Sequence, residues 1–185
     1  MPLPRSNAIN DTRMPTLEIL KYPDPRLRLV AKPVAQVTDE TRALVESMAE
    51  TMYAAAGCGL AATQVGVDAR IFVIDTAGED EASDLRVFIN PEIIHTQGVQ
   101  TWEEGCLSFP GASEEIRRAD RVKVRALDQF GKPFELEADG LLAIAIQHEN
   151  DHLNGVLMID KLNALKRRLV SRKVSRQLQE DASQS

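Results

Sequence analysis

The sequence has few cysteines and no long apolar run. Only two of its 185 residues are cysteines, so a disulfide framework is excluded and a reducing, cytoplasmic compartment is expected. No apolar run is long enough to span a membrane, and the first residues lack the apolar core of a signal peptide. Basic residues are also outnumbered by acidic ones. The resulting net charge of −6 argues against a general nucleic-acid binder.

What is present suits one globular domain. A hydrophobic content of 43% over this length is enough for a single substantial core. Residues 1–15 contain three prolines and little pattern, so we expect a loose leader there. The remaining residues, 16–185, are expected to form one domain, which the motifs described below would make catalytic.

The patterns of the middle of the chain indicate an α+β fold. Apolar residues recur at helical spacing after Thr38, where Asp39 and Glu40 follow as an N-terminal helix signal. Strands are predicted at 70–75 and 122–126, the second turning into a hairpin. Because these strands do not alternate with helices, we expect antiparallel or mixed sheets around a later helix.

That later helix carries the most informative motif of the chain. His148, Glu149 and His152 form H-E-x-x-H, and two of the three histidines of the protein lie in it. On a helix, residues four apart share a face, so both imidazoles can bind one metal ion while Glu149 reaches a water on that ion. This pattern predicts metal-assisted hydrolysis.

A catalytic metal site of this kind needs a third protein ligand. Downstream of the motif the sequence offers only Asp160 and a basic run. Upstream lies Cys106, whose thiolate would suit iron or zinc. Taken alone, Cys106 is better interpreted as a small buried residue.

Three motifs together make the chain resemble the peptide deformylase family. They are Gly57-Cys-Gly-Leu-Ala-Ala-Thr-Gln64, Glu104-Gly-Cys-Leu-Ser108 and Gln147-His-Glu-Asn-Asp-His152. The resemblance runs from about Leu17 to the last helix. Each motif alone is a moderate signal, whereas the three in this order are very specific.

The resemblance implies roles for named residues. Metal ligation is implied for Cys106, His148 and His152, and general acid/base catalysis for Glu149. Stabilisation of the oxyanion is implied for Gln64 and the backbone N–H of Leu107. Pairing with the substrate backbone is implied for Gly59.

The resemblance also implies a pocket for the first side chain of the substrate. Its implied lining residues are Cys58, Trp102, Leu141, Ile144 and Ala145. An unbranched, polarizable methionine side chain fits an apolar slot of this kind. The same residues are also consistent with ordinary core packing, and both interpretations can hold at once.

The implied activity is removal of the N-formyl group from the formylmethionine of newly made polypeptides, with release of formate. One divalent metal is expected: the resemblance implies iron(II), with nickel or cobalt as substitutes, and the donor set also suits zinc. Two alternatives remain, a metallo-endopeptidase and a non-catalytic, metal-stabilised peptide-binding module. We expect a monomer that does not bind membranes.

The C-terminal segment differs from the rest in charge. From Lys161 onward there are seven Lys and Arg residues against two acidic ones. A helix is predicted over 161–180, with an apolar stripe of Leu165, Leu169, Val174 and Leu178. One interpretation is a packed helix with a solvated basic face, and the other is docking to ribosomal RNA where the nascent chain emerges.

Overall fold

The computed structural model describes residues 14–184. In chain order the elements are η1 (Pro25–Arg28), α1 (Asp39–Ala54), β1 (Gly59–Ala61), η2 (Ala62–Val65), β2 (Ile71–Ile74), β3 (Arg86–Gln97), β4 (Gln100–Gly105), β5 (Ser113–Arg118), β6 (Arg121–Leu127), β7 (Pro133–Ala138), α2 (Gly140–Leu153), η3 (Met158–Lys161) and α3 (Ala164–Ser183). Every pairing between these strands is antiparallel, which confirms the predicted α+β fold.

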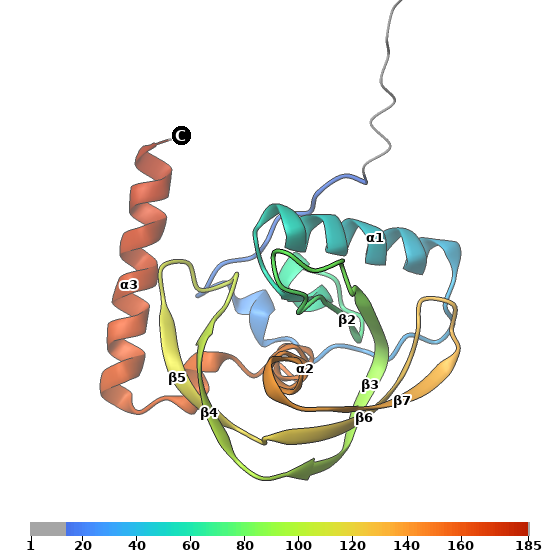
Figure 1. Cartoon of the computed structure of the whole chain (residues 1–185). Coiled ribbons are helices and arrows are strands. Elements are labelled where there is room, and N and C mark those ends of the chain that lie inside the picture. The colour runs from blue at the N-terminus through green and yellow to red at the C-terminus, as the bar shows by residue number, and fades with distance from the viewer. Residues whose placement is uncertain (1–13, 185) are drawn as a thin grey trace, which may run out of the picture.

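The strands form two sheets around α2. Five strands are ordered β1-β2-β3-β6-β7, and β4 and β5 form a separate two-stranded sheet. Figure 1 shows α2 end-on at the centre, with α1 above it, the β4–β5 arm beside it and α3 along the outer edge. The helix that carries the H-E-x-x-H motif is therefore enclosed by the rest of the fold.

α1 begins where the sequence predicts. The Thr38 hydroxyl accepts from the Thr41 backbone N–H, and the Thr41 hydroxyl accepts from the Thr38 N–H, which satisfies two N–H groups at the helix start. The buried side chains Val45, Met48 and Met52 pack in one cluster with residues of β1 and β2. This packing covers one face of the five-stranded sheet.

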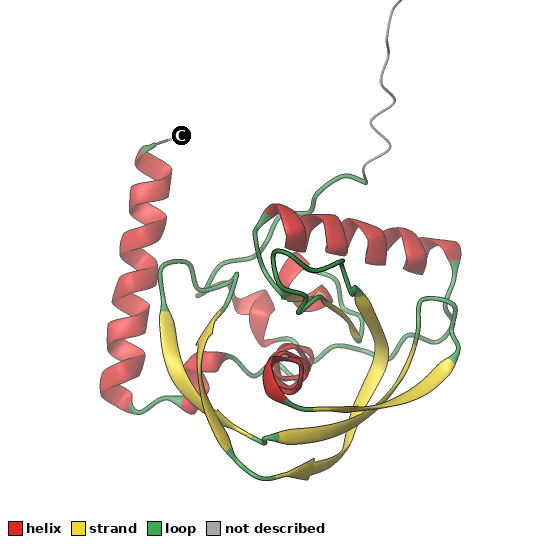
Figure 2. Ribbon diagram, in the orientation of Figure 1, coloured by secondary structure: helices red, strands yellow, loops and turns green. Residues whose placement is uncertain are grey.

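A bend in β3 lets the larger sheet wrap around α2. β3 pairs with β2 in its first part and with β6 along its length, and its register with β6 shifts after Ile89. Asn90 lies at this point with φ of 52°, and its side chain bonds both the N–H and the carbonyl of Val34. Asparagine tolerates this left-handed conformation better than most residues. Figure 2 shows the resulting curvature of the strands beneath the central helix.

α2 packs by one face and carries the motif on another. Ala143, Ile146 and Leu153 belong to the same buried cluster as the stacked rings of Phe72 and Phe88, whose centroids lie 4.8 Å apart. Burial on the sheet side holds the helix axis in place. The motif histidines therefore have a fixed position relative to the sheet.

Single residues mark the two ends of α2. Asp139 is the N-cap, but its side chain makes no capping hydrogen bond. After the helix, Gly155 has φ of +70°, and a Cβ there would lie 2.4 Å from the backbone oxygen of Arg28. Only glycine fits this conformation and this close approach.

α3 differs from the prediction in its start and its stripe. The predicted helix over 161–180 begins too early, because Lys161 still belongs to η3 and the Asn163 side chain caps α3 by accepting from Lys166 N. The buried stripe consists of Val170 and Val174, with Leu178 packed beside them. Contrary to the expected stripe, Leu165 and Leu169 are 65% and 44% exposed.

The predicted leader over 1–15 lies outside the described residues, apart from Met14 and Pro15. The domain boundary at residue 16 stays a prediction. Among the described helices, none combines the length and the apolar character needed to cross a membrane.

Candidate metal centre and active site

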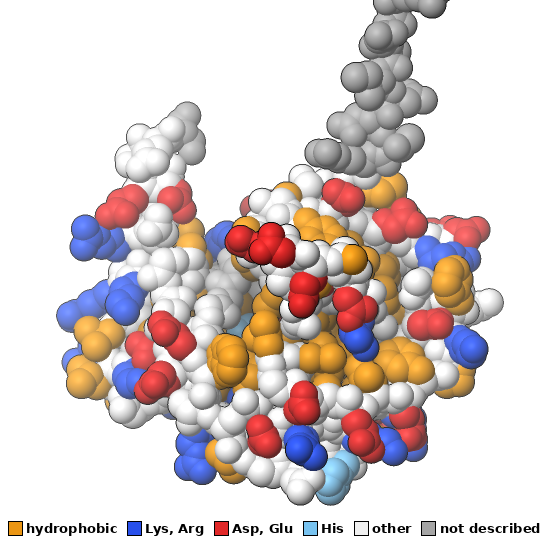
Figure 3. Space-filling model, in the orientation of Figure 1, with side chains coloured by type: hydrophobic (Ala, Val, Ile, Leu, Met, Phe, Trp, Pro, Cys, Tyr) orange, Lys and Arg blue, Asp and Glu red, His pale blue; other side chains and the backbone are white. Residues whose placement is uncertain are grey.

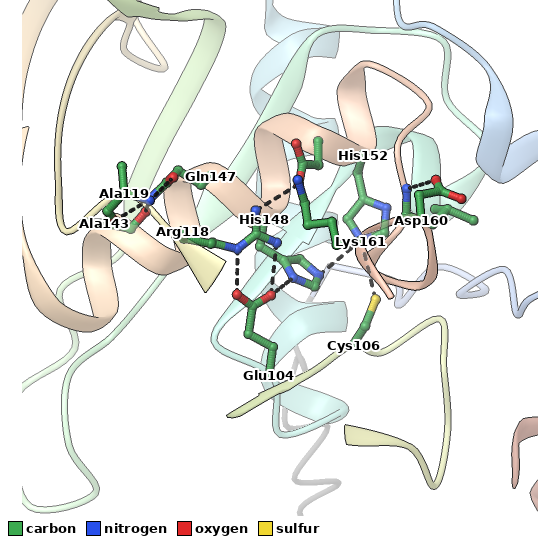
Figure 4. A network of polar contacts seen from close by, with 12 residues as sticks. Glu104, Cys106, Arg118, Ala119, Ala143, Gln147, His148, His152, Asp160 and Lys161 are labelled. Carbon is green, nitrogen blue, oxygen red and sulfur yellow. Dashed lines mark hydrogen bonds and ion pairs between the residues drawn. The ribbon is translucent and has the colours of Figure 1, made fainter. Parts of the chain in front are cut away.

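The three predicted metal ligands meet from two separate elements. His148 and His152 lie one turn apart on α2, and Cys106 directly follows β4. The two Nε2 atoms are 3.2 Å apart, and Cys106 Sγ lies 3.3 Å from His152 Nε2. All three ligand atoms lie within 4.8 Å of one another (Figure 4). The structure therefore brings together the residues that the resemblance implies.

The chemistry of this donor set fits a metal ion. His148 Nδ1 donates to Glu104 Oε2 at 2.8 Å, which leaves the Nε2 lone pair directed towards His152. Burial lowers the pKa of His152 well below its ordinary value, so this ring is neutral and can donate a lone pair. One thiolate and two imidazole nitrogens suit iron(II) or zinc.

A buried ion-pair network supports His148 from behind. Arg118 Nη2 donates to Glu104 Oε2 at 2.9 Å, and Arg118 Nη1 donates to Asp151 Oδ2 at 2.8 Å. Lys161 Nζ lies 3.1 Å from the same Asp151 oxygen. Burial raises the pKa of Glu104, but the bonds from His148 and Arg118 outweigh it and bring the pKa below the ordinary value. Glu104 is therefore a carboxylate that fixes the orientation of the His148 ring.

Sequence reasoning did not select Glu104 or Arg118 as site residues. A signal existed for Glu104, because it belongs to a recognised motif and a metal-binding histidine usually donates its second N–H to a carboxylate. Arg118 gives no such signal, since it is one of several arginines around the β5–β6 turn. Only the pairing of β4 with β5 brings it close to Glu104.

Glu149 is buried next to the ligands. It is 4% exposed, and its Oε2 has no hydrogen-bond partner among the described residues. Burial raises its pKa to about 7, although His148 and Arg118 act in the opposite direction. The backbone of Gly59 packs against this carboxylate, because a Cβ at Gly59 would lie 2.5 Å from Glu149 Oε1.

The side-chain amide of Gln64 directs its N–H groups towards Cys106 and Ser108. Its Oε1 accepts from the backbone N–H of Ala61 at 2.9 Å. Its Nε2 then donates to Ser108 Oγ at 3.1 Å and lies 3.6 Å from Cys106 Sγ. The amide N–H groups of Gln64 therefore face the loop that follows β4, which contains Cys106 and Leu107. Ser108, the partner that fixes this orientation, was missed by sequence reasoning.

A cleft of about 540 Å³ opens beside these groups. Figure 3 shows apolar side chains gathered across the middle of this hollowed face. Trp102 and Leu141, 42% and 37% exposed, lie at its mouth, whereas Ile144 and Ala145 are buried in its wall. The cleft is lined by all six predicted substrate-binding residues: Cys58, Gly59, Trp102, Leu141, Ile144 and Ala145.

Comparison with known proteins identifies relatives over most of the chain. The family model for polypeptide deformylase matches residues 16–168. The chain is 55% identical to a peptide deformylase of Alkalilimnicola ehrlichii over 163 residues, which is 88% of this chain and 91% of that protein. It is 51% identical to a peptide deformylase of Pseudomonas aeruginosa over 170 residues, covering 91% of this chain and all of that protein.

Solved structures agree with this similarity. A peptide deformylase from Legionella pneumophila superposes with a TM-score of 0.86 at 47% identity, over 90% of this chain and 98% of that one. A peptide deformylase from Ehrlichia chaffeensis in complex with actinonin gives 0.84 at 40% identity, over 88% and 98%. With matches of this extent in sequence and in fold, the chain belongs to the polypeptide deformylase family.

Proposed function

We propose that the chain is a metal-dependent peptide deformylase that removes the formyl group from the N-terminal formylmethionine of new polypeptides and releases formate. The observation that carries this proposal is the meeting of Cys106, His148 and His152 beside the buried Glu149, at the wall of an apolar cleft. The family membership supports the same activity.

Different residues of the site have different roles in the proposed reaction. Cys106 Sγ and the Nε2 atoms of His148 and His152 would hold the metal, which when bound acidifies a water molecule so that hydroxide is available near neutral pH. Glu149 takes the proton of that water and later delivers it to the departing amine. The Gln64 amide donates to the formyl oxygen as negative charge develops on it, and the Leu107 N–H is the second donor.

The cleft supplies the binding energy and the orientation of the substrate. Ile144 and Ala145 offer an apolar wall on the helix that carries Glu149, and Leu141 and Trp102 extend it to the surface. A methionine side chain placed there would bring its formyl group towards the metal ligands. Gly59 has room for a close backbone approach because it has no side chain.

We propose iron(II) as the bound metal, with nickel, cobalt or zinc as substitutes. A site with one thiolate and two imidazoles accepts each of these ions. Metal analysis of protein purified without oxygen, and again in air, tests this assignment. Equal zinc content and equal activity after both treatments would contradict it, since an iron(II)–thiolate site should lose activity in air.

The proposed partner besides the formylated chain is the ribosome, contacted through the basic outer face of α3. Figure 3 shows Lys and Arg side chains along that side of the molecule. The monomeric state and the cytoplasmic location stay predictions.

The test of the function is an assay of formate release. The protein should release formate from a formyl-Met tripeptide, and it should leave an acetyl-Met tripeptide and an unblocked longer peptide intact. Glu149→Gln should keep the bound metal, because Glu149 is not a ligand, and should lose about 10²–10⁴-fold in kcat. Cleavage of the unblocked peptide would favour an endopeptidase, and peptide binding without turnover would favour a binding module.

A further inference from the structure

The segment before η1 binds both parts of the site that carry the oxyanion donors. The Leu20 N–H donates to the backbone carbonyl of Gln64 at 2.7 Å, and the Tyr22 N–H donates to the Ser108 carbonyl at 2.8 Å. Between them, Lys21 Nζ donates to the Leu107 carbonyl at 2.6 Å. Three consecutive residues thus connect the Gln64 segment to the loop that follows Cys106.

Lys21 differs from the other lysines because it lines the cleft. It is half-buried, and it is the only Lys or Arg among the described residues that line the cleft. Lysine usually extends its ammonium into water, because removing the charge from water is costly. Desolvation accordingly lowers the pKa of Lys21, while attraction by Cys106 and Asp181 opposes that effect.

The Tyr22 N–H and the Gln64 amide hold this loop at Ser108, and Lys21 adds a hydrogen bond one residue earlier, at the Leu107 carbonyl. Cys106 and Leu107 lie beyond the end of β4, in a turn closed by the Phe109 N–H on the Cys106 carbonyl. A charged donor on a carbonyl makes a shorter and stronger hydrogen bond than a neutral one. The ammonium therefore holds the Leu107–Ser108 peptide directly, and through the Leu107 Cα it limits how far the preceding Cys106–Leu107 peptide, which carries the Leu107 N–H, can move away from Gln64.

We propose that Lys21 is a positioning residue for deformylation. Its ammonium holds the Leu107 carbonyl so that the Leu107 N–H and the Gln64 amide face the same formyl oxygen. Its positive charge lies in the wall of the cleft, next to the loop that carries Leu107. This inference rests on the proposed function, because it assigns Lys21 a part in the same chemistry.

A donor set that is needed only in the transition state should affect turnover and not substrate binding. Lys21→Met keeps a long unbranched side chain without the ammonium group, and we expect it to lower kcat about 10-fold to 100-fold with KM within about 2-fold. Lys21→Arg should restore kcat to within about 5-fold of the parent. Metal content should be equal in all three proteins, since Lys21 is not a ligand.

The matched control is Lys32→Met, which removes an exposed lysine whose Nζ pairs with Asp68 at 2.7 Å, away from the cleft. It should leave kcat and KM unchanged. A second measurement is hydrogen exchange of the peptide covering residues 104–112, which should be faster in Lys21→Met than in the parent or the control. Lys21→Gln, which keeps a donor but not the charge, gives a second variant if the methionine variant fails to fold.

The results separate this inference from the function itself. A parent that releases no formate would overturn both. An active parent with unchanged kcat in Lys21→Met or Lys21→Gln would overturn the role of Lys21 alone. So would a loss that appears only in KM, a loss matched by lost metal, or a failure of Lys21→Arg to restore turnover.

Discussion

Gly59 shows how one missing side chain determines the geometry of the site. Its backbone lies against the Glu149 carboxylate, and the cleft opens on its other side. A glycine at this position looks from sequence like a turn residue, but its φ is not in the left-handed region. The structure shows a requirement for space next to the proposed proton carrier.

Gly59→Ala should therefore impair turnover more than folding. The added Cβ would lie 2.5 Å from Glu149 Oε1, so the carboxylate must move. A displacement of about 1 Å costs roughly 10²-fold in rate, and we expect a loss of that order in kcat with metal content retained. The control is Gly78→Ala, whose Cβ would find its nearest neighbour at 3.6 Å. Parent-like kcat in Gly59→Ala would contradict this account of the close approach.

The two cysteines are predicted to differ in function because they differ in position. Cys106 Sγ faces His152, whereas Cys58 lies exposed at the cleft. Cys106→Ser replaces a thiolate by a hydroxyl and should weaken metal binding by more than about 100-fold, which exceeds the usual effect of changing an outer partner. Cys58→Ala should leave the metal in place. Titration with a competing chelator measures both, and the reverse pattern would mean that the cysteines are wrongly assigned.

At the scale of elements, the Asp75 carboxylate connects the acidic loop over residues 78–84 to the ends of α1 and β2. Asp75 follows β2 and accepts from the Tyr53 and Ser83 hydroxyls, both at 2.7 Å, and from the N–H groups of Ala77 and Asp84. Burial raises the pKa of Asp75, but these bonds outweigh it and lower the pKa to about 2. The charged form therefore stabilises the folded loop.

This pKa gives the contribution of Asp75 a defined pH window. A carboxyl with a folded pKa of about 2 and an unfolded pKa near 3.9 stabilises the fold above about pH 4, and this contribution is lost as the pH falls towards 2. Asp75→Asn should lower the free energy of unfolding at pH 6 by up to about 1 kcal/mol, since solvent screens the site. The difference from the parent should shrink at pH 2.5. Urea unfolding at both pH values measures it, and an equal difference at both would exclude the charge as the cause.

At the scale of the whole molecule, α3 carries an excess of positive charge, whereas the rest of the chain is acidic. The outer face of α3 carries Arg168, Arg172 and Lys173, which have no ion pair or hydrogen bond within the described residues. Other cations of the helix are engaged: Arg167 donates to the Leu162 carbonyl, and Lys166 pairs with Glu114. The polyanionic partner proposed above would meet these unengaged cations together with the exposed Leu165 and Leu169.

Replacing these three unengaged cations by Gln should weaken ribosome binding and leave the hydrolysis of a short peptide unchanged. The triple variant should hydrolyse a short formyl peptide at the parent rate, because none of the three lines the cleft. It should co-sediment less with ribosomes, and the slope of binding against salt should fall by about one unit for each lost phosphate contact. Lys32→Gln is the control. Equal co-sedimentation of parent and triple variant would return this face to the simpler interpretation of a solvated surface.

The sequence alone determined those features that depend on near neighbours in the chain. Helical spacing placed His148 and His152 on one face of α2, and the motif set Glu149 beside them. The start of α1 followed from Thr38 and the residues after it. Each of these is a local pattern, in which the interacting groups are a few residues apart.

Only the tertiary structure decided the features that depend on distant residues. Cys106 reaches the histidines because β4 ends beside α2, and Arg118 reaches Glu104 through the register of β4 with β5. Lys21 is 86 residues from Leu107 in the chain, so no spacing indicates their contact. Of the predicted stripe of α3, Val174 and Leu178 pack as expected, whereas Leu165 and Leu169 are exposed. The reason is the same, because the partner surface and not the helix alone determines which face packs.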